Sequence, residues 1–268
     1  YGDHRDLHLS LRRQRQMCIR DSFNTILMKN IPRVDLNDFL SNEPTRKNAF
    51  VKSLGQTFEK IGFVILKGHY LSKDKTDLLY KEIKAFFDLT EAQKRAYEIP
   101  GMAGQRGYTS FGKESAKGSK HGDLKEFWHF GQYLSEKDVN RYDYFPNIIV
   151  EELPEFNKVG EEVYKNLEKT AKHVLRALAL YLNISEDYFD NYINNGNSIL
   201  RPIHYPPIKE DPKEAVRAAA HGDINLITLL MGAHGKGLQV KSADGQWIDA
   251  VASDCLLYTS DAADEGLV

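Results

Sequence analysis

The hydrophobic pattern of this chain changes its period near residue 196, and this change constrains the fold more than any other feature. Before it, apolar residues recur at helical spacing, most clearly in a segment that Pro44 opens and Gly62 closes and in a long segment that starts at Pro154. After it come short apolar runs and turn residues, at 198–205, at 223–231 and in a hairpin pattern around Asp244-Gly245. Helices followed by short strands predict an α+β protein with an antiparallel sandwich and helices packed on its outside.

Shorter signals add detail to the helical part. The apolar run 63–66 lies between two glycines and predicts a buried strand. Two helix starts are also predicted: Ser72 is placed to cap one helix, and Thr90 with Gln93 forms a capping box for the next. Residues 101–122 are rich in Gly, Ser and Lys and predict a loop. An arginine and two aromatic residues in this loop suit a substrate lid, although a solvated loop with a few packing aromatics explains the same composition.

The two ends of the chain differ from the rest. Residues 1–22 and 255–268 resemble translated sequencing-adapter sequence, most clearly in the strings MCIRDS and LLYTSDAADE. Such segments are set aside before the fold is considered, although a natural arm and tail are the alternative. We therefore expect four parts: 1–22 as a non-native segment, 23–196 as an N-terminal helical region, 197–254 as the first part of a strand-rich domain, and 255–268 as a second non-native segment.

Composition excludes several classes of function. The net charge is −2 and the pI is near 6.5, which gives no electrostatic reason to expect nucleic acid as a partner. No run of 18 apolar residues occurs, so the sequence predicts no membrane span. Both cysteines, Cys18 and Cys255, lie in the two ends, and a remainder without cysteine suits a reducing, cytoplasmic location.

The best chemical signal is the tripeptide His221-Gly222-Asp223. Side chains two residues apart on a strand point to the same face, so an imidazole nitrogen and a carboxylate oxygen can reach one ion together. Such a pair is two thirds of the 2-His-1-carboxylate arrangement that holds ferrous iron in oxygenases. Two other His-x-Asp triplets occur, at 4–6 and 121–123, but only this one opens an apolar strand that can hold a ligand rigidly.

An ordered series of motifs accompanies this tripeptide over residues 30–254. The series comprises Ile31-Pro32-Arg33-Val34-Asp35, the run 62–69, Gly107-Tyr108, the run 123–127, His204-Tyr205-Pro206-Pro207, Ala220-His221-Gly222-Asp223 and the run 237–240. In this order the chain resembles the iron- and 2-oxoglutarate-dependent dioxygenases of the isopenicillin-N-synthase-like type. The resemblance implies a double-stranded β-helix, or jelly roll, preceded by a helical region, with residues 197–254 as the first part of the jelly-roll domain.

The resemblance also implies an activity. It predicts an oxidoreductase that uses Fe(II) and the co-substrate 2-oxoglutarate to oxidise a small organic substrate with O2, usually by hydroxylation, and that releases succinate and CO2. Two alternatives stay open. One is an isopenicillin-N-synthase-like oxidase or an ethylene-forming enzyme of the same family. The other is a non-catalytic jelly-roll binding module, in which His221 is a structural histidine hydrogen-bonded to Asp223.

Individual residues receive roles from the resemblance. His221 and Asp223 match the first two iron ligands, as metal ligands and not as acid or base catalysts. Tyr205 matches the tyrosine that contacts the co-substrate carboxylate, while Ile203 stands where many relatives have an asparagine. The expected substrate-pocket residues, for each of which ordinary packing is the alternative, are Arg106, Tyr108, Phe111 and Phe127.

The family pattern also requires a second histidine and an Arg-x-Ser sequence after the aspartate. The guanidinium of that arginine pairs with the distal carboxylate of 2-oxoglutarate. After Asp223 this chain has one histidine, His234, in a glycine-rich turn, and no arginine follows Arg217. We therefore expect the sequence as written to hold an incomplete jelly roll.

The chain as written is expected to bind Fe(II) weakly and to be inactive, because two protein ligands are fewer than the three that the site needs. Anaerobic Fe(II) titration and a succinate-formation assay on the purified chain measure both quantities. Tight binding of one ferrous ion together with turnover of 2-oxoglutarate would contradict this prediction.

Overall fold

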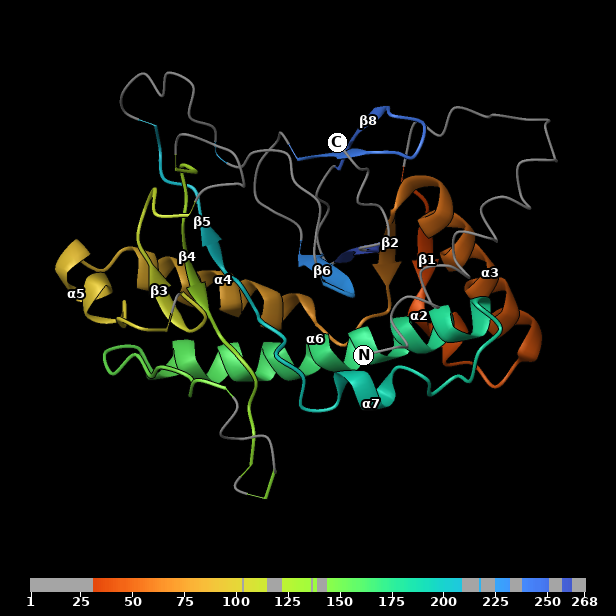
Figure 1. Cartoon of the computed structure of the whole chain (residues 1–268), viewed down its shortest axis with the longest axis horizontal. Helices are drawn as coiled ribbons and strands as arrows, with labels where there is room; N and C mark the ends of the chain where they lie inside the picture. The colour runs from red at the N-terminus through yellow and green to blue at the C-terminus, as the bar shows by residue number, and fades with distance from the viewer. Residues whose placement is uncertain are drawn as a thin grey trace. The chain divides into compact units, whose positions relative to one another are not determined.

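The computed structural model describes residues 31–102, 104–114, 122–135, 137–138, 144–208, 217, 225–231 and 238–250, and the backbone alone of 257–261. All of them fall within one unit of the chain, Ile31–Val268, most of whose elements are labelled in Figure 1. The helices are α2 (Leu36–Phe39), α3 (Pro44–Ile61), α4 (Lys73–Phe87), α5 (Glu91–Ala96), α6 (Pro154–Tyr181) and α7 (Asp190–Ile193). The strands are β1 (Arg33–Asp35), β2 (Phe63–Lys67), β3 (Gly107–Thr109), β4 (Glu126–His129), β5 (Ile203–His204), β6 (Ile227–Met231), β7 (Gln239–Lys241), β8 (Trp247–Asp249) and β9 (Leu257–Asp261).

The helix boundaries follow the capping signals of the sequence. Helix α3 has Pro44 in its first turn and ends at Gly62, whose φ of 78° is the left-handed conformation that glycine adopts without strain. At the start of α4 the Ser72 hydroxyl accepts a hydrogen bond from the backbone N–H of Lys75 at 3.2 Å. The capping box of Thr90 and Gln93 is also present at α5. These helix predictions are confirmed.

Hydrogen bonds join the described strands into three sheets, with strand orders β1-β2-β9-β6, β3-β4-β5 and β7-β8. The β7-β8 pair is the hairpin predicted around Asp244-Gly245. The described strand pairs are antiparallel, as the sequence predicts for the strands after residue 196, except that β1 and β2 are parallel. Helices α2 and α3 connect these two strands, and a crossover of this kind returns the chain in its original direction. Strand β9, within the segment 255–268, pairs with both β2 and β6.

The predicted loop 101–122 contains a strand. Residues 107–109 form β3 and pair with β4, so the loop prediction is wrong for these three residues, all of which are buried. Conversely, the predicted strand 198–205 shortens to the two residues of β5 and an isolated bridge between Leu200 and Phe130. Pro202 lies between them and lacks the N–H that a continuous ladder requires. Residues 1–22, 115–121 and 221–224 lie outside the described part of the chain.

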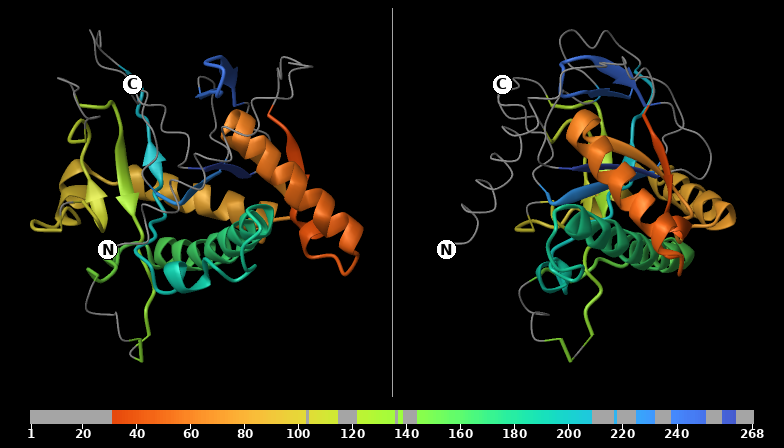
Figure 2. Two further views of the ribbon diagram at one scale, coloured as in Figure 1. Left: turned by 45° about the vertical axis from the view of Figure 1, so that its right-hand side comes forward. Right: turned by 90° about the vertical axis from the view of Figure 1, so that its right-hand side faces the viewer.

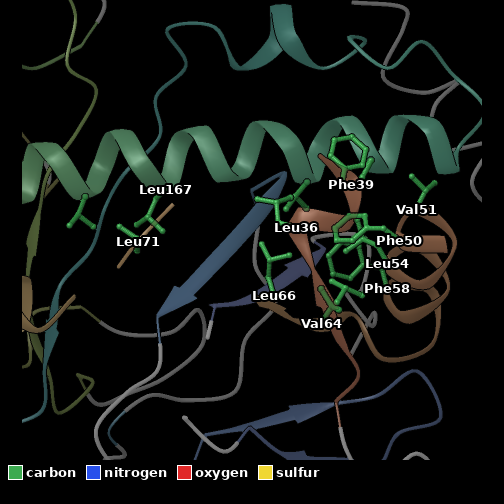
Figure 3. Close-up of a cluster of buried hydrophobic side chains, with 14 of the residues drawn as sticks. Leu36, Phe39, Phe50, Val51, Leu54, Phe58, Val64, Leu66, Leu71 and Leu167 are labelled. Atoms are coloured by element: carbon green, nitrogen blue, oxygen red, sulfur yellow. The ribbon is translucent and has the colours of Figure 1, made fainter. Parts of the chain in front are cut away.

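Helix α6 carries the apolar stripe on which the helical region packs, as its helical spacing predicts. It lies against both α3 and α4 (Figures 1 and 2). Toward α3, its Val163 and Leu167 belong to a buried cluster with Leu54 and with side chains of β2 (Figure 3). Toward α4, its Phe156 stacks on Phe86 with ring centroids 5.1 Å apart. Among the described helices, none is long and apolar enough to cross a bilayer.

Truncation of Leu54 to alanine is expected to lower the free energy of unfolding by about 2–5 kcal/mol, because the side chain is fully buried and its removal leaves a cavity. Leu40→Ala is the matched control, since that side chain is 41% exposed, and a change within about 0.5 kcal/mol is expected. Urea unfolding followed by circular dichroism measures both. Equal losses in the two variants would contradict the assignment of Leu54 to the core.

Candidate functional site

The side chains of strand β4 point alternately to the two faces of the β3-β4-β5 sheet. Alternate residues of a strand point to opposite faces, so Glu126 and Trp128 share one side while Phe127 and His129 share the other. Trp128 packs against Phe86 of α4, with ring centroids 4.8 Å apart. We therefore call the side of Trp128 the helix face, and the side of Phe127 and His129 the site face.

Glu126 organises the polar contacts on the helix face. Its carboxylate is buried and accepts hydrogen bonds from Lys94 Nζ at 2.7 Å, from His204 Nδ1 at 2.7 Å and from the Tyr108 hydroxyl. Burial alone would raise the pKa of Glu126, but the three donors, with Lys94 foremost, outweigh it and hold the pKa below its usual range. The carboxylate thus joins α5, β3 and β5 to β4.

On the site face, His129 orients Arg201. The Nε–H of Arg201 donates to His129 Nε2 at 2.5 Å, and the opposite ring nitrogen, Nδ1, lies 2.5 Å from the carbonyl oxygen of Gly104. Because an arginine Nε–H can only donate, Nε2 is the acceptor and Nδ1 carries the proton. Burial, reinforced by the charge of Arg201, lowers the pKa of His129 to about 3, so the imidazole stays neutral.

The Arg201 guanidinium has two further neighbours. It lies over the ring of Phe127, 4.5 Å from the centroid, and its Nη1 is 3.2 Å from Glu114 Oε1. Glu114 also pairs with Lys125 at 2.8 Å, and Lys125 in turn pairs with Asp123 at 2.8 Å. The site face therefore carries a chain of alternating charges beside an aromatic ring.

Tyr205 lies next to these charges. It is half-buried, and burial raises the pKa of its phenol, with smaller electrostatic effects from Lys125, Asp123, Arg201 and Arg217. Arg217 Nη1 also donates to the backbone carbonyl of Tyr205 at 3.2 Å. The predicted co-substrate residue and the charged groups of the site face thus form one region.

The other predicted site residues are dispersed. Phe127 lies on the site face, whereas Tyr108 lies on the helix face, and Phe111 is 47% exposed. Arg106 is buried, donates to Asn197 Oδ1 at 3.1 Å, and has no partner for its Nε among the described residues. Their roles in substrate binding stay predictions.

The predicted iron ligands His221 and Asp223 lie outside the described residues. Within the part of the chain that the structure describes, no group of three or more His, Cys, Asp and Glu side chains is arranged to hold a metal ion.

Sequence reasoning did not single out the partners of Phe127 and Tyr205 on this face. Arg201 is 72 residues from His129 and 87 residues from Glu114 along the chain, so no local spacing links them. The run 123–127, quoted for the family resemblance, was the available signal, because two of its charged residues, Asp123 and Lys125, belong to the site-face network.

Replacement of His129 by glutamine is expected to reduce the loss of stability in acid. The unfolded chain binds a proton at a histidine near pH 6.5, whereas folded His129 stays neutral down to a pKa of about 3. Unfolding therefore takes up this proton, and stability falls as the pH drops, by about 1.4 kcal/mol per pH unit below 6.5. Urea unfolding of both proteins across this range tests the expectation, and equal slopes would contradict it.

Comparison with known proteins adds a family model and several relatives. Residues 31–152 match the family model described as the N-terminal region of non-haem dioxygenases in morphine synthesis. The 2-oxoglutarate-Fe(II) type oxidoreductase hxnY of Emericella nidulans is 29% identical over 81% of this chain and 65% of its own length. A 2-oxoglutarate-Fe(II) type oxidoreductase of Aspergillus fumigatus is 30% identical over 81% of the chain and 67% of its own length. The chain thus spans about two thirds of the length of these curated relatives.

The chain is also similar to solved structures of 2-oxoglutarate- and Fe(II)-dependent enzymes. A 2OG-Fe(II) oxygenase family protein from Caulobacter crescentus is 38% identical, with a TM-score of 0.75 over 87% of this chain and 74% of that one. A full-length Neurospora crassa protein, solved in complex with alpha-KG, is 28% identical, with a TM-score of 0.75 over 86% of this chain and 72% of that one. Structures of this kind have the jelly-roll fold that the family resemblance implies.

Proposed function

We propose, because this chain belongs to the family of iron(II)- and 2-oxoglutarate-dependent dioxygenases, that the protein oxidises a small organic substrate with O2 and converts 2-oxoglutarate to succinate and CO2. The observation that carries the proposal within the structure is the site face. There Tyr205, Phe127 and a chain of charged side chains gather on the side of the sheet opposite to Trp128 and α4.

His221 and Asp223 would hold the iron. An imidazole nitrogen and a carboxylate oxygen are donors that suit a ferrous ion. The tripeptide precedes β6, whose described residues start at Ile227. When bound, iron with 2-oxoglutarate supplies the oxidising power, and the protein supplies orientation and protection from solvent.

Tyr205 would orient the co-substrate. Since burial raises the pKa of its phenol, the hydroxyl stays protonated at neutral pH and can donate a hydrogen bond to a carboxylate. Its backbone position is held on both sides: Arg217 bonds its carbonyl, and the preceding His204 is fixed by Glu126.

Phe127 would form one wall of the substrate pocket, with Arg106, Tyr108 and Phe111 as further candidates from the family resemblance. Phe127 supports this role by its place beneath Arg201 on the site face. Relatives are associated with varied molecules: one is named a proline hydroxylase, and the Neurospora protein has been solved with thymine. The proposal therefore extends to a small organic substrate and to no single compound.

A pair of identical tripeptides gives a matched test of the iron site. His221→Ala is expected to weaken Fe(II) binding at least about tenfold in the presence of 2-oxoglutarate, because it removes a direct ligand. His121→Ala, in the second His-Gly-Asp sequence, is the control and is expected to stay within about twofold of the parent chain. Anaerobic calorimetric titration of Fe(II) measures both, and the ratio between the variants, not the absolute affinity, is the test. Equal affinities of the His221→Ala variant and the parent would overturn the assignment.

A further inference from the structure

The guanidinium of Arg201 is held in place, but not all of its N–H donors have an acceptor among the described residues. Its Nε is bonded to the neutral ring of His129, and its plane rests on Phe127. Its Nη1 lies 3.2 and 3.4 Å from the two oxygens of Glu114, at the long end of hydrogen-bond distances. Among the described residues, its Nη2 has no hydrogen-bond partner, and the side chain remains 37% exposed. An oriented, charged donor edge therefore stays open on the site face.

Glu114 is shared between Arg201 and Lys125, and Lys125 also pairs with Asp123. The Lys125–Glu114 contact of 2.8 Å is shorter than either contact between Glu114 and Arg201. The described charges around Tyr205 are Lys125, Arg201 and Arg217 against Asp123 and Glu114, which leaves one positive charge in excess. The neutral His129 adds no charge to this sum. The region is therefore suited to attract an anion.

Apolar surface lies beside this donor edge. Ile203 stands opposite Phe127 in the β4-β5 ladder, so both side chains share the site face. Phe127 is covered by the guanidinium, whereas Ile203 remains 37% exposed. A ligand on this face would meet a fixed cation at one end and an aliphatic side chain next to it.

We propose that Arg201 binds the carboxylate of an apolar organic acid, which makes such acids the substrate class of this enzyme. The assignment rests on the proposed function for the identity of the site face. A guanidinium fork suits a carboxylate because two parallel N–H groups match its two oxygens, and Arg201 offers such an edge already oriented by His129, Glu114 and Phe127. The apolar body of the acid lies against Ile203.

Benzoate and its neutral isostere benzamide test this proposal in the absence of iron and 2-oxoglutarate. Ligand-observed NMR titration of the full chain is expected to show benzoate binding about 10- to 100-fold more tightly than benzamide, the range for a charge-assisted hydrogen bond. Arg201→Gln is expected to abolish the preference. Arg201→Lys is expected to keep part of it, because the charge remains and the fork is lost. Circular dichroism confirms that each variant is folded, and the lysine variant preserves the test if the glutamine variant does not fold.

Arg46→Gln is the matched control, because Arg46 is an exposed arginine paired with Asp38 in another part of the fold, and the preference for benzoate is expected to survive. Equal binding of the two probes to the parent chain, or an Arg201→Gln variant that retains the preference, would overturn the proposal. So would an equal loss in the Arg46→Gln control. Displacement of benzoate by 2-oxoglutarate would assign Arg201 to the co-substrate and overturn the substrate assignment. Because no metal is added, these outcomes are distinct from failure of the iron site.

Discussion

The alternation of side chains along β4 places two unlike environments on the two sides of one short sheet, and the candidate site depends on this division. Trp128 and Glu126 face α4 and α5, where aromatic packing and a buried ion pair fix the strand. Phe127 and His129 consequently face the other way, beside Arg201. A slip of one residue in the ladder would exchange the two sets, so the register of β4 determines which groups reach the site.

The buried carboxylate of Glu126 is the contact that makes this register specific. A buried ion pair adds little net stability, because desolvation offsets most of the attraction, but an incorrect register would leave Lys94 or Glu126 without its partner. Three donors from three elements meet on this one carboxylate. One of them, His204, directly precedes Tyr205, so the contact on the helix face also fixes the backbone of a residue on the site face.

Much of the helical region was predictable because its signals are local. A proline at the start of α3, a left-handed glycine at its end and the capping box of α5 each act within a few residues. Strands β3 and β4 carried no such signal. They are three and four residues long, and β4 is buried on both faces although it contains Glu126 and His129. Polar and charged residues in a sequence suggest solvent exposure. Glu126 and His129 can be buried because partners that are distant in the sequence satisfy their polar groups.

The candidate site was predictable to the same degree and for the same reason. Tyr205 and Phe127 came from ordered motifs, whereas the groups that define their surroundings are brought together by tertiary packing. Arg201 shows the limit: neighbouring sequence cannot reveal that its Nε meets a histidine 72 residues away. The jelly-roll expectation came from the order of motifs along the chain, which summarises long-range contacts that no single segment contains.

The neutrality of His129 contributes to the difference in charge between the two faces. On the helix face, Lys94 and Glu126 carry opposite charges and balance each other. On the site face, the Nε–H of Arg201 donates to the uncharged ring of His129. The carboxylate that pairs with Arg201, Glu114, also pairs with Lys125. A carboxylate in place of the imidazole would orient the guanidinium equally well but would cancel its charge. A neutral ring fixes the direction of the fork and leaves the positive charge available to whatever lies against this face.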